Sequence, residues 1–464
     1  MSTTSGSRLG LLRHPNFARL WTAATVSLFG TQVSQIAIPF IAAVVLQASP
    51  AEVGLLTTIE FLPFLLFTLP AGVWVDRFPK RRILILGDLV RAAMLVSIPI
   101  AAAANVLTIW QLYVVGFVNG IATVFFDVAD QSYLPTILER DELVEGNSKL
   151  QISQSSAQIL GQPFGGGIVA VLSAPVAILV DAASYLGSAG LIVSIRERLG
   201  GARSTAAAKA PDPATAVGPD LADGPTTESS VAAETAASAD PVTPGGGMRS
   251  QIMDGLRYIL RHEYLGNIAA TTATSNLFGN IAFAIFPVFT YRVLLLRPEQ
   301  VGTIGGFGGA GVLLGALAAG RIQARLGVGW TIVLTALAFG PIAVLIALAT
   351  PETAFWLLAV ALFVGGFNGV VYNIAQVSLR QAITPAHFLG RMNATMRFLV
   401  WGTIPVGSVL GAALSEFLPG GVRTTVWVSA LLSFLPCLPV LFSSVRRVKE
   451  MPTVDPDGPT PAGA

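Results

Sequence analysis

Long apolar runs recur along the chain, separated by short polar connections. Four clear examples cover residues 83–104, 174–195, 330–349 and 353–371. Each approaches the roughly 20 residues that a helix needs to cross about 30 Å of hydrocarbon. Twelve such segments can be distinguished, near residues 17–45, 52–75, 82–104, 107–130, 147–172, 174–196, 264–292, 299–321, 328–349, 353–377, 389–417 and 421–445. The pattern therefore predicts an all-α integral membrane protein with 12 transmembrane helices.

Composition supports a membrane protein and excludes several other classes. Of 464 residues, 53% are hydrophobic and only 12% are charged, which lies far from ordinary soluble usage. Cys437 is the only cysteine, so a disulfide within the chain is impossible. The Gly-rich stretch at 306–311 lies inside an apolar span, which indicates helix packing and not a dinucleotide site, and there is no P-loop motif. With three widely separated histidines, we expect no metal, no cofactor, no nucleotide or nucleic-acid partner and no enzymatic activity.

Basic residues are unevenly divided between the two sides of the predicted membrane. On one side the loops hold only Arg292, Arg297 and Arg423. The other side holds Arg77, Lys80, Arg81, Arg82, Arg140, Lys149, Arg196, Arg198, Arg321, Arg325, Arg380, Arg391, Arg446, Arg447 and Lys449. Because basic loops stay in the cytoplasm, we expect a multi-pass plasma-membrane protein with both termini cytoplasmic. The first apolar run is too long for a cleaved leader, so none is expected.

The chain divides into two halves around a polar segment. Residues 1–199 form the predicted N-terminal six-helix bundle, 200–248 a disordered cytoplasmic linker, 249–448 the C-terminal bundle and 449–464 a disordered tail. The C-terminal bundle begins with a segment of helical apolar spacing, which predicts either an amphipathic surface helix or the start of span seven. A shift of 246 residues pairs Phe117 with Phe363, Asn147 with Asn393, and Gly161 and Gly165 with Gly407 and Gly411, which indicates internal duplication. Two pseudo-symmetric six-helix bundles are typical of transporters.

Side-chain amides concentrate in spans one, four, five, seven and ten. An amide in hydrocarbon needs a partner or water, so these side chains predict either a polar cavity or hydrogen bonds between helices. The predicted cavity set is Gln32, Gln35, Asn119, Gln154, Gln158, Asn276, Asn280, Asn368, Tyr372, Asn373 and Arg397. Arg397 could attract an anionic substrate or neutralise Asp127 or Asp130.

Two carboxyls inside the spans are candidates for proton coupling. Glu60 lies in span two and Asp181 in span six, and an acid at a helix centre costs roughly 2.5 to 3.5 kcal/mol to insert. Either could exchange a proton as a cavity changes sides, or either could be a structural acid bonded to a neighbouring hydroxyl or to the backbone.

The stretch "GVWVDRFPKRR" resembles the loop between spans two and three in the major facilitator superfamily. Gly72, Asp76, Arg77, Arg81 and Arg82 match that pattern, although Pro79 stands where the family often has Gly. The stretch "GQPFGG", with Gly161, Pro163, Gly165 and Gly166, is similar to the span-five motif of the antiporters in this superfamily. "RHPNFARLW", "LPTILERDELVEGNSKL" and "LVDAASYL" resemble the drug-exporting branch that includes macrolide efflux proteins and the enterobactin exporter.

This resemblance implies a proton-coupled exporter of amphipathic small molecules that works by alternating access. Asp76 would meet the start of span eleven, and Arg77 or Arg81 would meet Asp127 or Asp130, as a latch that closes the cytoplasmic side. The expected partners are a small-molecule substrate such as a drug, macrolide, siderophore or secondary metabolite, coupling protons and the lipid bilayer, with the protein a monomer. A facilitator or importer of a small nutrient and a non-transporting receptor or scaffold are the alternatives.

Overall fold

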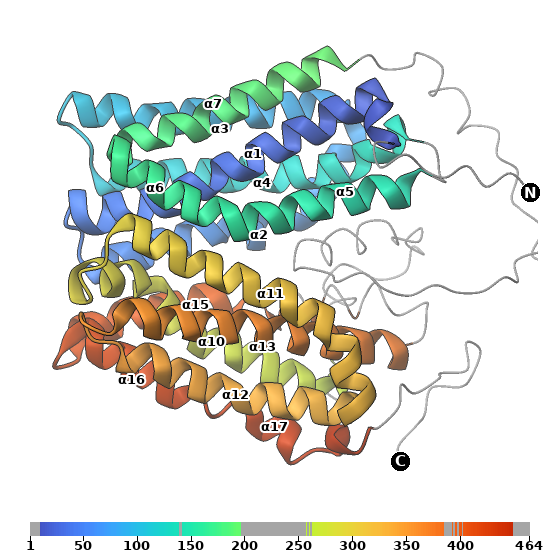
Figure 1. Cartoon of the computed structure of the whole chain (residues 1–464), viewed down its shortest axis with the longest axis vertical. Helices are drawn as coiled ribbons and strands as arrows, with labels where there is room; N and C mark the ends of the chain where they lie inside the picture. The colour runs from blue at the N-terminus through green and yellow to red at the C-terminus, as the bar shows by residue number, and fades with distance from the viewer. Residues whose placement is uncertain are drawn as a thin grey trace, which may run out of the picture.

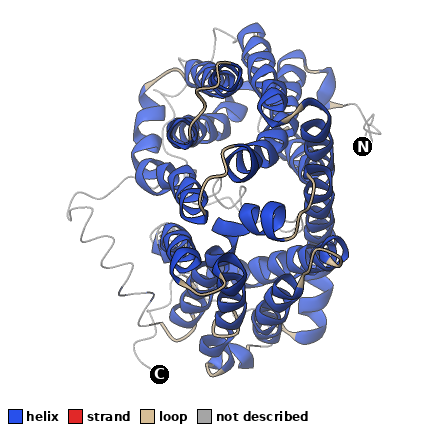
Figure 2. Cartoon of the chain, turned by 90° about the vertical axis from the view of Figure 1, so that its left-hand side faces the viewer, coloured by secondary structure: helices blue, strands red, loops and turns tan. Residues whose placement is uncertain are grey.

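Two helical bundles lie side by side in the computed structural model (Figure 1). The structure describes residues 10–138, 142–195, 257, 259, 262–384, 392, 395–396, 399–400 and 402–448. The predicted linker and tail therefore lie outside the described residues, as does most of the segment that leads into span seven. Seen along the helices, both bundles consist of helices joined by short connections (Figure 2).

The described helices reproduce the predicted spans closely. The N-terminal bundle contains α1 (Pro15–Phe40), α2 (Pro50–Arg77), α3 (Lys80–Ala103), α4 (Ile109–Ile137), α5 (Leu143–Ser156), α6 (Gln162–Leu172) and α7 (Ala174–Ser194). The C-terminal bundle contains α10 (Leu265–Val288), α11 (Pro298–Leu326), α12 (Val328–Leu348), α13 (Ala354–Ile383), α15 (Thr403–Phe417), α16 (Gly421–Leu432) and α17 (Cys437–Leu441). Ten spans are long and apolar enough to cross a membrane. The continuous stretch from α5 through α6 and the shorter α15 supply two further crossings, which gives twelve.

The first helices of the two bundles end in the same unusual way. Each carries a proline, Pro39 or Pro287, followed by a five-residue π-helix, η2 (Ile41–Val45) or η5 (Phe289–Val293). Eight residues after each proline the backbone is left-handed, at Gln47 and at Leu295. A matching irregularity at matching positions confirms that the halves are structural repeats.

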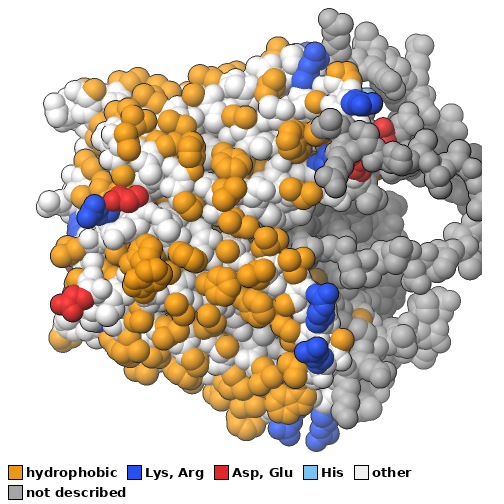
Figure 3. All heavy atoms as spheres, viewed as in Figure 1, with side chains coloured by type: hydrophobic (Ala, Val, Ile, Leu, Met, Phe, Trp, Pro, Cys, Tyr) orange, Lys and Arg blue, Asp and Glu red, His pale blue; other side chains and the backbone are white. Residues whose placement is uncertain are grey.

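The membrane surface of the molecule is apolar. Large side chains such as Trp74, Trp110, Trp356 and Phe417 are exposed. In the space-filling view hydrophobic side chains cover the middle of the molecule, and Lys and Arg gather towards one end (Figure 3). We call the end that carries the α2–α3 turn the basic end, and the end that carries η2 and η5 the far end.

Among the described residues, the buried apolar core is shared between the halves at the far end only. One cluster joins N-terminal residues such as Ile36 and Leu56 to C-terminal residues such as Phe289 and Leu358. Towards the basic end the core separates into a cluster around Phe17 and Leu84 in the N-terminal bundle and another around Ile332 and Leu379 in the C-terminal bundle. The second of these includes Ile259, which is fully buried, so this residue of the predicted amphipathic segment packs against its own bundle. Within the described residues the two halves thus share one core at the far end and have separate cores at the basic end.

Candidate functional site

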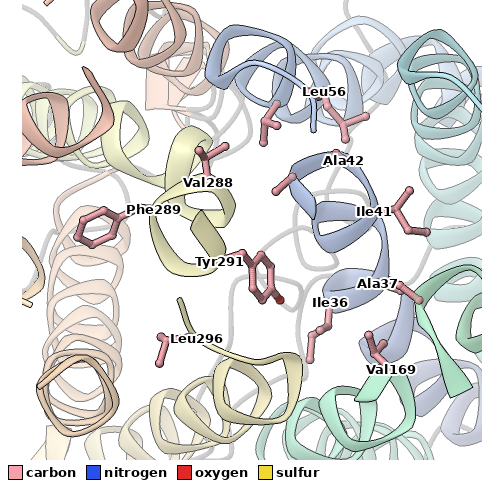
Figure 4. Packing of buried hydrophobic residues seen from close by; sticks show 14 of the residues in the cluster. Ile36, Ala37, Ile41, Ala42, Leu56, Val169, Val288, Phe289, Tyr291 and Leu296 are labelled. Carbon is pink, nitrogen blue, oxygen red and sulfur yellow. The ribbon is translucent and has the colours of Figure 1, made fainter. Parts of the chain in front are cut away.

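The two π-helices meet across the far end. The ring of Tyr291 meets that of Phe40 edge-on, with centroids 5.0 Å apart, and Arg292 Nε donates to the carbonyl of Ala43. Figure 4 shows Tyr291 in the space between the end of α10 and the end of α1, with Ile36 and Leu296 nearby. These contacts cross from one bundle to the other, so the halves are joined at this end.

A second crossing lies between α6 and α11, where backbone meets backbone. A methyl group at Gly302 would overlap the carbonyl oxygen of Gln162, and one at Gly306 would lie 2.6 Å from Pro163 Cγ. A methyl group at Gly166 would overlap the carbonyl oxygen of Pro298. Only glycine allows this approach, so the Gly-rich run at 306–311 forms part of a helix contact, as predicted.

The glycines of the span-five motif serve two different contacts. Gly161 and Gly165 face α1 of their own bundle, where added methyl groups would lie 2.6 Å from Gln32 Cγ and 2.8 Å from Gln32 O. Pro163 and Gly166 face the other bundle. Gly407 and Gly411 likewise pack against α10, so the predicted repeat of the glycine pair is also a repeat of its packing partner. In this stretch the contact between the halves is thus made by Pro163 and Gly166, and not by Gly161 and Gly165.

A third crossing joins α2 to α15. A methyl group at Gly54 would lie 2.8 Å from Ala412 Cβ and 3.4 Å from the carbonyl oxygen of Ser408. Gly54 lies in the second turn of α2, close to the far end. Together with the α6–α11 contact, this places the tight joins between the bundles at one end of the molecule.

The predicted latch residues at the basic end contact their own bundle in this conformation. Arg81 donates to the carbonyl oxygens of Ile192 and Val193, with its Nε 3.2 Å from the first. No described residue lies within 4 Å of the place that a Cβ at Gly72 would take, and Arg77 and Arg82 make no ion pair with another described residue. Nor do the described residues include an ion pair from Arg81 to Asp127 or Asp130. The side chains of Asp76 and Arg397 lie outside the described part of the chain.

The predicted cavity residues fall into two groups. Gln35 is exposed and the half-buried members are Asn119, Gln154, Gln158, Asn276, Asn280 and Asn373. Three others are buried in contacts between helices. Gln32 packs under Gly161, Asn368 donates to the carbonyl oxygen of Thr335 at 2.9 Å, and the Tyr372 hydroxyl lies 2.8 Å from that of Thr272. For Asn368 and Tyr372 the structure shows the alternative role, hydrogen bonds between helices, whereas Gln32 Oε1 is buried without a hydrogen-bond partner among the described residues.

The two predicted coupling acids lie in different surroundings. Glu60 is half-buried against α4, and its Cγ would lie 2.9 Å from a methyl group at Gly116. Asp181 is buried between α7 and α1, where it accepts a hydrogen bond from Ser184 at 3.2 Å. A methyl group at Gly30 would lie 2.8 Å from Asp181 Oδ1, so glycine in α1 lets this carboxyl reach the neighbouring helix.

A buried ion pair on α3 was not among the predicted site residues. Arg91 Nη2 lies 2.6 Å from Asp88 Oδ1, and both side chains are almost completely buried. The guanidinium lies between two aromatic rings, 4.1 Å from the centroid of Phe126 and 4.3 Å from that of Tyr185. The sequence held a signal for it, because two opposite charges at a spacing of three interrupt the apolar run of the third span.

Comparison with known proteins gives one family across the whole chain. The profile of the Major Facilitator Superfamily matches residues 20–401. Macrolide efflux protein A of Streptococcus pyogenes is 21% identical over 94% of this chain and 97% of its own length. Multidrug efflux pump Tap of Mycolicibacterium fortuitum is 25% identical over 95% of this chain and 97% of its own.

Solved structures show the same fold. A bacterial homologue of the iron transporter ferroportin, described in an inward-facing state, aligns with a TM-score of 0.67 at 13% identity and covers 93% of this chain and 98% of its own. The nucleoside transporter NupG aligns with a TM-score of 0.64, also at 13% identity, and covers 92% and 98%.

Proposed function

Because the chain belongs to the major facilitator superfamily, we propose that it exports amphipathic small molecules in exchange for protons by alternating access. The observation that carries this proposal is the divided core, shared at the far end and split at the basic end. Alternating access requires two halves that can part at one end while they stay joined at the other. Relatives named as macrolide and multidrug efflux proteins align over almost the full length and supply the substrate class.

The charge distribution gives the direction in which the molecule faces. Described bases at the basic end include Arg77, Lys80, Arg81, Arg321 and Arg325, whereas the far end has Arg292, Arg297 and Arg423. By the positive-inside rule the basic end is cytoplasmic, in a bacterial plasma membrane, with both termini on that side. In this orientation the conformation is open to the cytoplasm and closed to the outside, which is the state that loads substrate for export.

Closure of the basic end completes the cycle in this proposal. The latch of Asp76, Arg77, Arg81 and Arg82 engages only in the outward-open state, in which Asp76 meets the start of span eleven in the other half and Arg77 or Arg81 meets Asp127 or Asp130 in its own half. Contacts made in one state alone bias the equilibrium between states, so this latch favours the outward-open form and the glycine crossings favour the inward-open one. The polar positions that are exposed or half-buried, from Gln35 to Asn373, line the substrate route.

Glu60 and Asp181 are the predicted proton carriers, and their removal tests the coupling. We expect Glu60→Gln and Asp181→Asn to lower gradient-driven export at least tenfold, because an amide cannot release a proton. The assay uses proteoliposomes of the full chain with ethidium or erythromycin as probe and an imposed pH gradient, with nigericin as the control that collapses it.

The same assay separates the alternatives. Wild-type flux that does not respond to the pH gradient would remove antiport and favour a facilitator or importer. Full gradient-driven export by both variants would show that neither acid carries the proton, while the exporter proposal would stand. No flux of any probe in either direction would favour a receptor or scaffold.

A further inference from the structure

We infer that Asp88, Arg91, Asp127, Asp130 and Asp181 form one ionic centre that reaches from the surface of the bundle into its interior, and that the proton content of this centre as a whole sets which end of the transporter is open. The inference deepens the proposed function and rests on it, because it assigns the coupling site to a network centred on α3. Neither Asp88 nor Arg91 belongs to the substrate route described above.

The centre has more negative groups than positive ones. Arg91 pairs with Asp88, and the carboxyls of Asp127, Asp130 and Asp181 lie within electrostatic range of the same guanidinium. Four carboxyls around one guanidinium would hold a net charge of about three negative units if all were ionised, which is costly because Asp88 and Asp181 are buried. Neighbouring carboxyls that cannot all ionise share protons, so they titrate as a group.

Each helix packed against Arg91 contributes a defined set of groups. The titratable groups are Asp127 and Asp130 from α4 and Asp181 and Tyr185 from α7; α1 contributes the hydroxyls of Thr31 and Ser34. Of the four carboxyls, Asp127 is exposed, Asp130 is half-buried, and Asp88 and Asp181 are buried. This order leads from an accessible carboxyl to enclosed ones, as a path for a proton requires.

The centre also has unused hydrogen-bonding capacity. Ser188 is fully buried beside the Asp88 carboxyl, yet within the described residues neither its hydroxyl nor Asp88 Oδ2 completes a hydrogen bond by strict geometry. Arg91 Nε is likewise buried without an acceptor among them. A proton on Asp88 Oδ2 would supply the missing donor to Ser188, so the site is built to hold the carboxyl in either form.

A chain of contacts connects the centre to the closed end. The Tyr185 ring covers Arg91, and the Tyr185 hydroxyl lies 2.9 Å from that of Thr31 on α1. The Asp181 carboxyl approaches α1 at Gly30, one residue away. From there α1 runs directly into η2, whose residues make the crossing to η5. A change of charge at Arg91 therefore acts on the helix that closes the far end.

Opposite changes of charge should shift the protein in opposite directions. In Asp88→Asn the guanidinium is left to stabilise the remaining ionised carboxyls, so they release their protons at lower pH. In Arg91→Gln that stabilisation is lost, so protons are held to higher pH. We expect shifts of about 1 pH unit each way, since an adjacent opposite charge typically has effects of this size. The double variant should return close to the wild-type midpoint.

The readout is the pH midpoint of opening at the far end, which requires no substrate. Spin labels at Val106→Cys and Glu352→Cys, both exposed at the far end and in different halves, report the distance between the bundles in a Cys437→Ser background. Arg380→Gln is the matched control, because Arg380 is a buried arginine of the C-terminal half outside this centre, with Nε also lacking an acceptor among the described residues. Its midpoint should equal that of the wild type.

Three results would overturn the inference: a wild-type distance that does not change with pH, shifts of Asp88→Asn and Arg91→Gln in the same direction, or a double variant that does not return. If Arg91→Gln does not fold, the double variant Asp88→Asn/Asp181→Asn tests the inference instead. Its pH midpoint of far-end opening must lie below that of Asp88→Asn alone. Opposite shifts in a protein that moves neither ethidium nor erythromycin would keep the ionic centre and reject the proposed substrate class.

Discussion

The far end and the basic end join the two halves by different chemistry. At the far end glycines of α11 and α6 bring backbone against backbone, and one apolar core spans both bundles. At the basic end no described residue lies within 4 Å of a Cβ placed at Gly72, and Arg81 bonds to its own bundle. A backbone contact fits at one distance only, whereas long charged side chains can engage or release a partner. Close backbone packing thus joins the halves at the far end, whereas contacts of charged side chains can join them at the basic end.

The largest effect should follow from one methyl group in the α6–α11 crossing. Gly302→Ala would push against the carbonyl oxygen of Gln162, and overpacking of this kind costs about 1 to 3 kcal/mol. Only the state closed at the far end bears that cost, so the ratio of outward-open to inward-open protein should rise about 5- to 150-fold. Distances between spin labels across the far end measure this ratio.

Gly320→Ala is the matched control on the same helix. No atom lies within 4 Å of the position that its methyl group would take. Both substitutions bring the same gain in helix propensity, so any difference between them comes from the crossing. If both variants keep the wild-type ratio, the glycine contact does not hold the far end shut.

A smaller effect is expected from the aromatic pair of the two π-helices. Tyr291→Leu removes the edge-on contact with Phe40, which is worth about 0.5 to 1.5 kcal/mol beyond buried area. The outward-open population should rise about 2- to 12-fold. Phe355 and Trp356 form a pair with the same 5.0 Å spacing inside one helix, so Phe355→Leu should leave the ratio unchanged. Equal shifts in both variants would mean that general destabilisation, and not the crossing, is being measured.

Most of the fold could be predicted from the sequence. Apolar run lengths located the spans to within a few residues for most helices, and the repeated glycines indicated two halves. The spacing of Gly161 and Gly165 places them on one helical face. It does not identify the helix that packs against them, because α1 and α11 both pack against that stretch.

The candidate site was harder to predict for a physical reason. The amide of Asn368 has the same cost in hydrocarbon whether it faces a cavity or bonds to Thr335, so its presence cannot distinguish these roles. Asp88 and Arg91 lie in a run whose average hydropathy still predicts a span, because the favourable apolar residues outweigh two charges that neutralise each other. The conformation itself depends on small energy differences between two packings, which no local pattern records.

The smallest effect should come from the charge that closes the basic end. Asp76→Asn keeps the size of the side chain and removes its negative charge. A carboxylate at a helix N-terminus contributes about 0.3 to 1 kcal/mol, and the proposed latch meets the start of span eleven only in the outward-open state. The variant should therefore lower the outward-open population about 2- to 5-fold, opposite in sign to Gly302→Ala.

Insertion and probe binding should be unchanged in Asp76→Asn, as measured by membrane yield and by ethidium fluorescence. Loss of insertion would instead show that the charges of this turn serve membrane topology alone, because topology is set during insertion, before the two halves assemble.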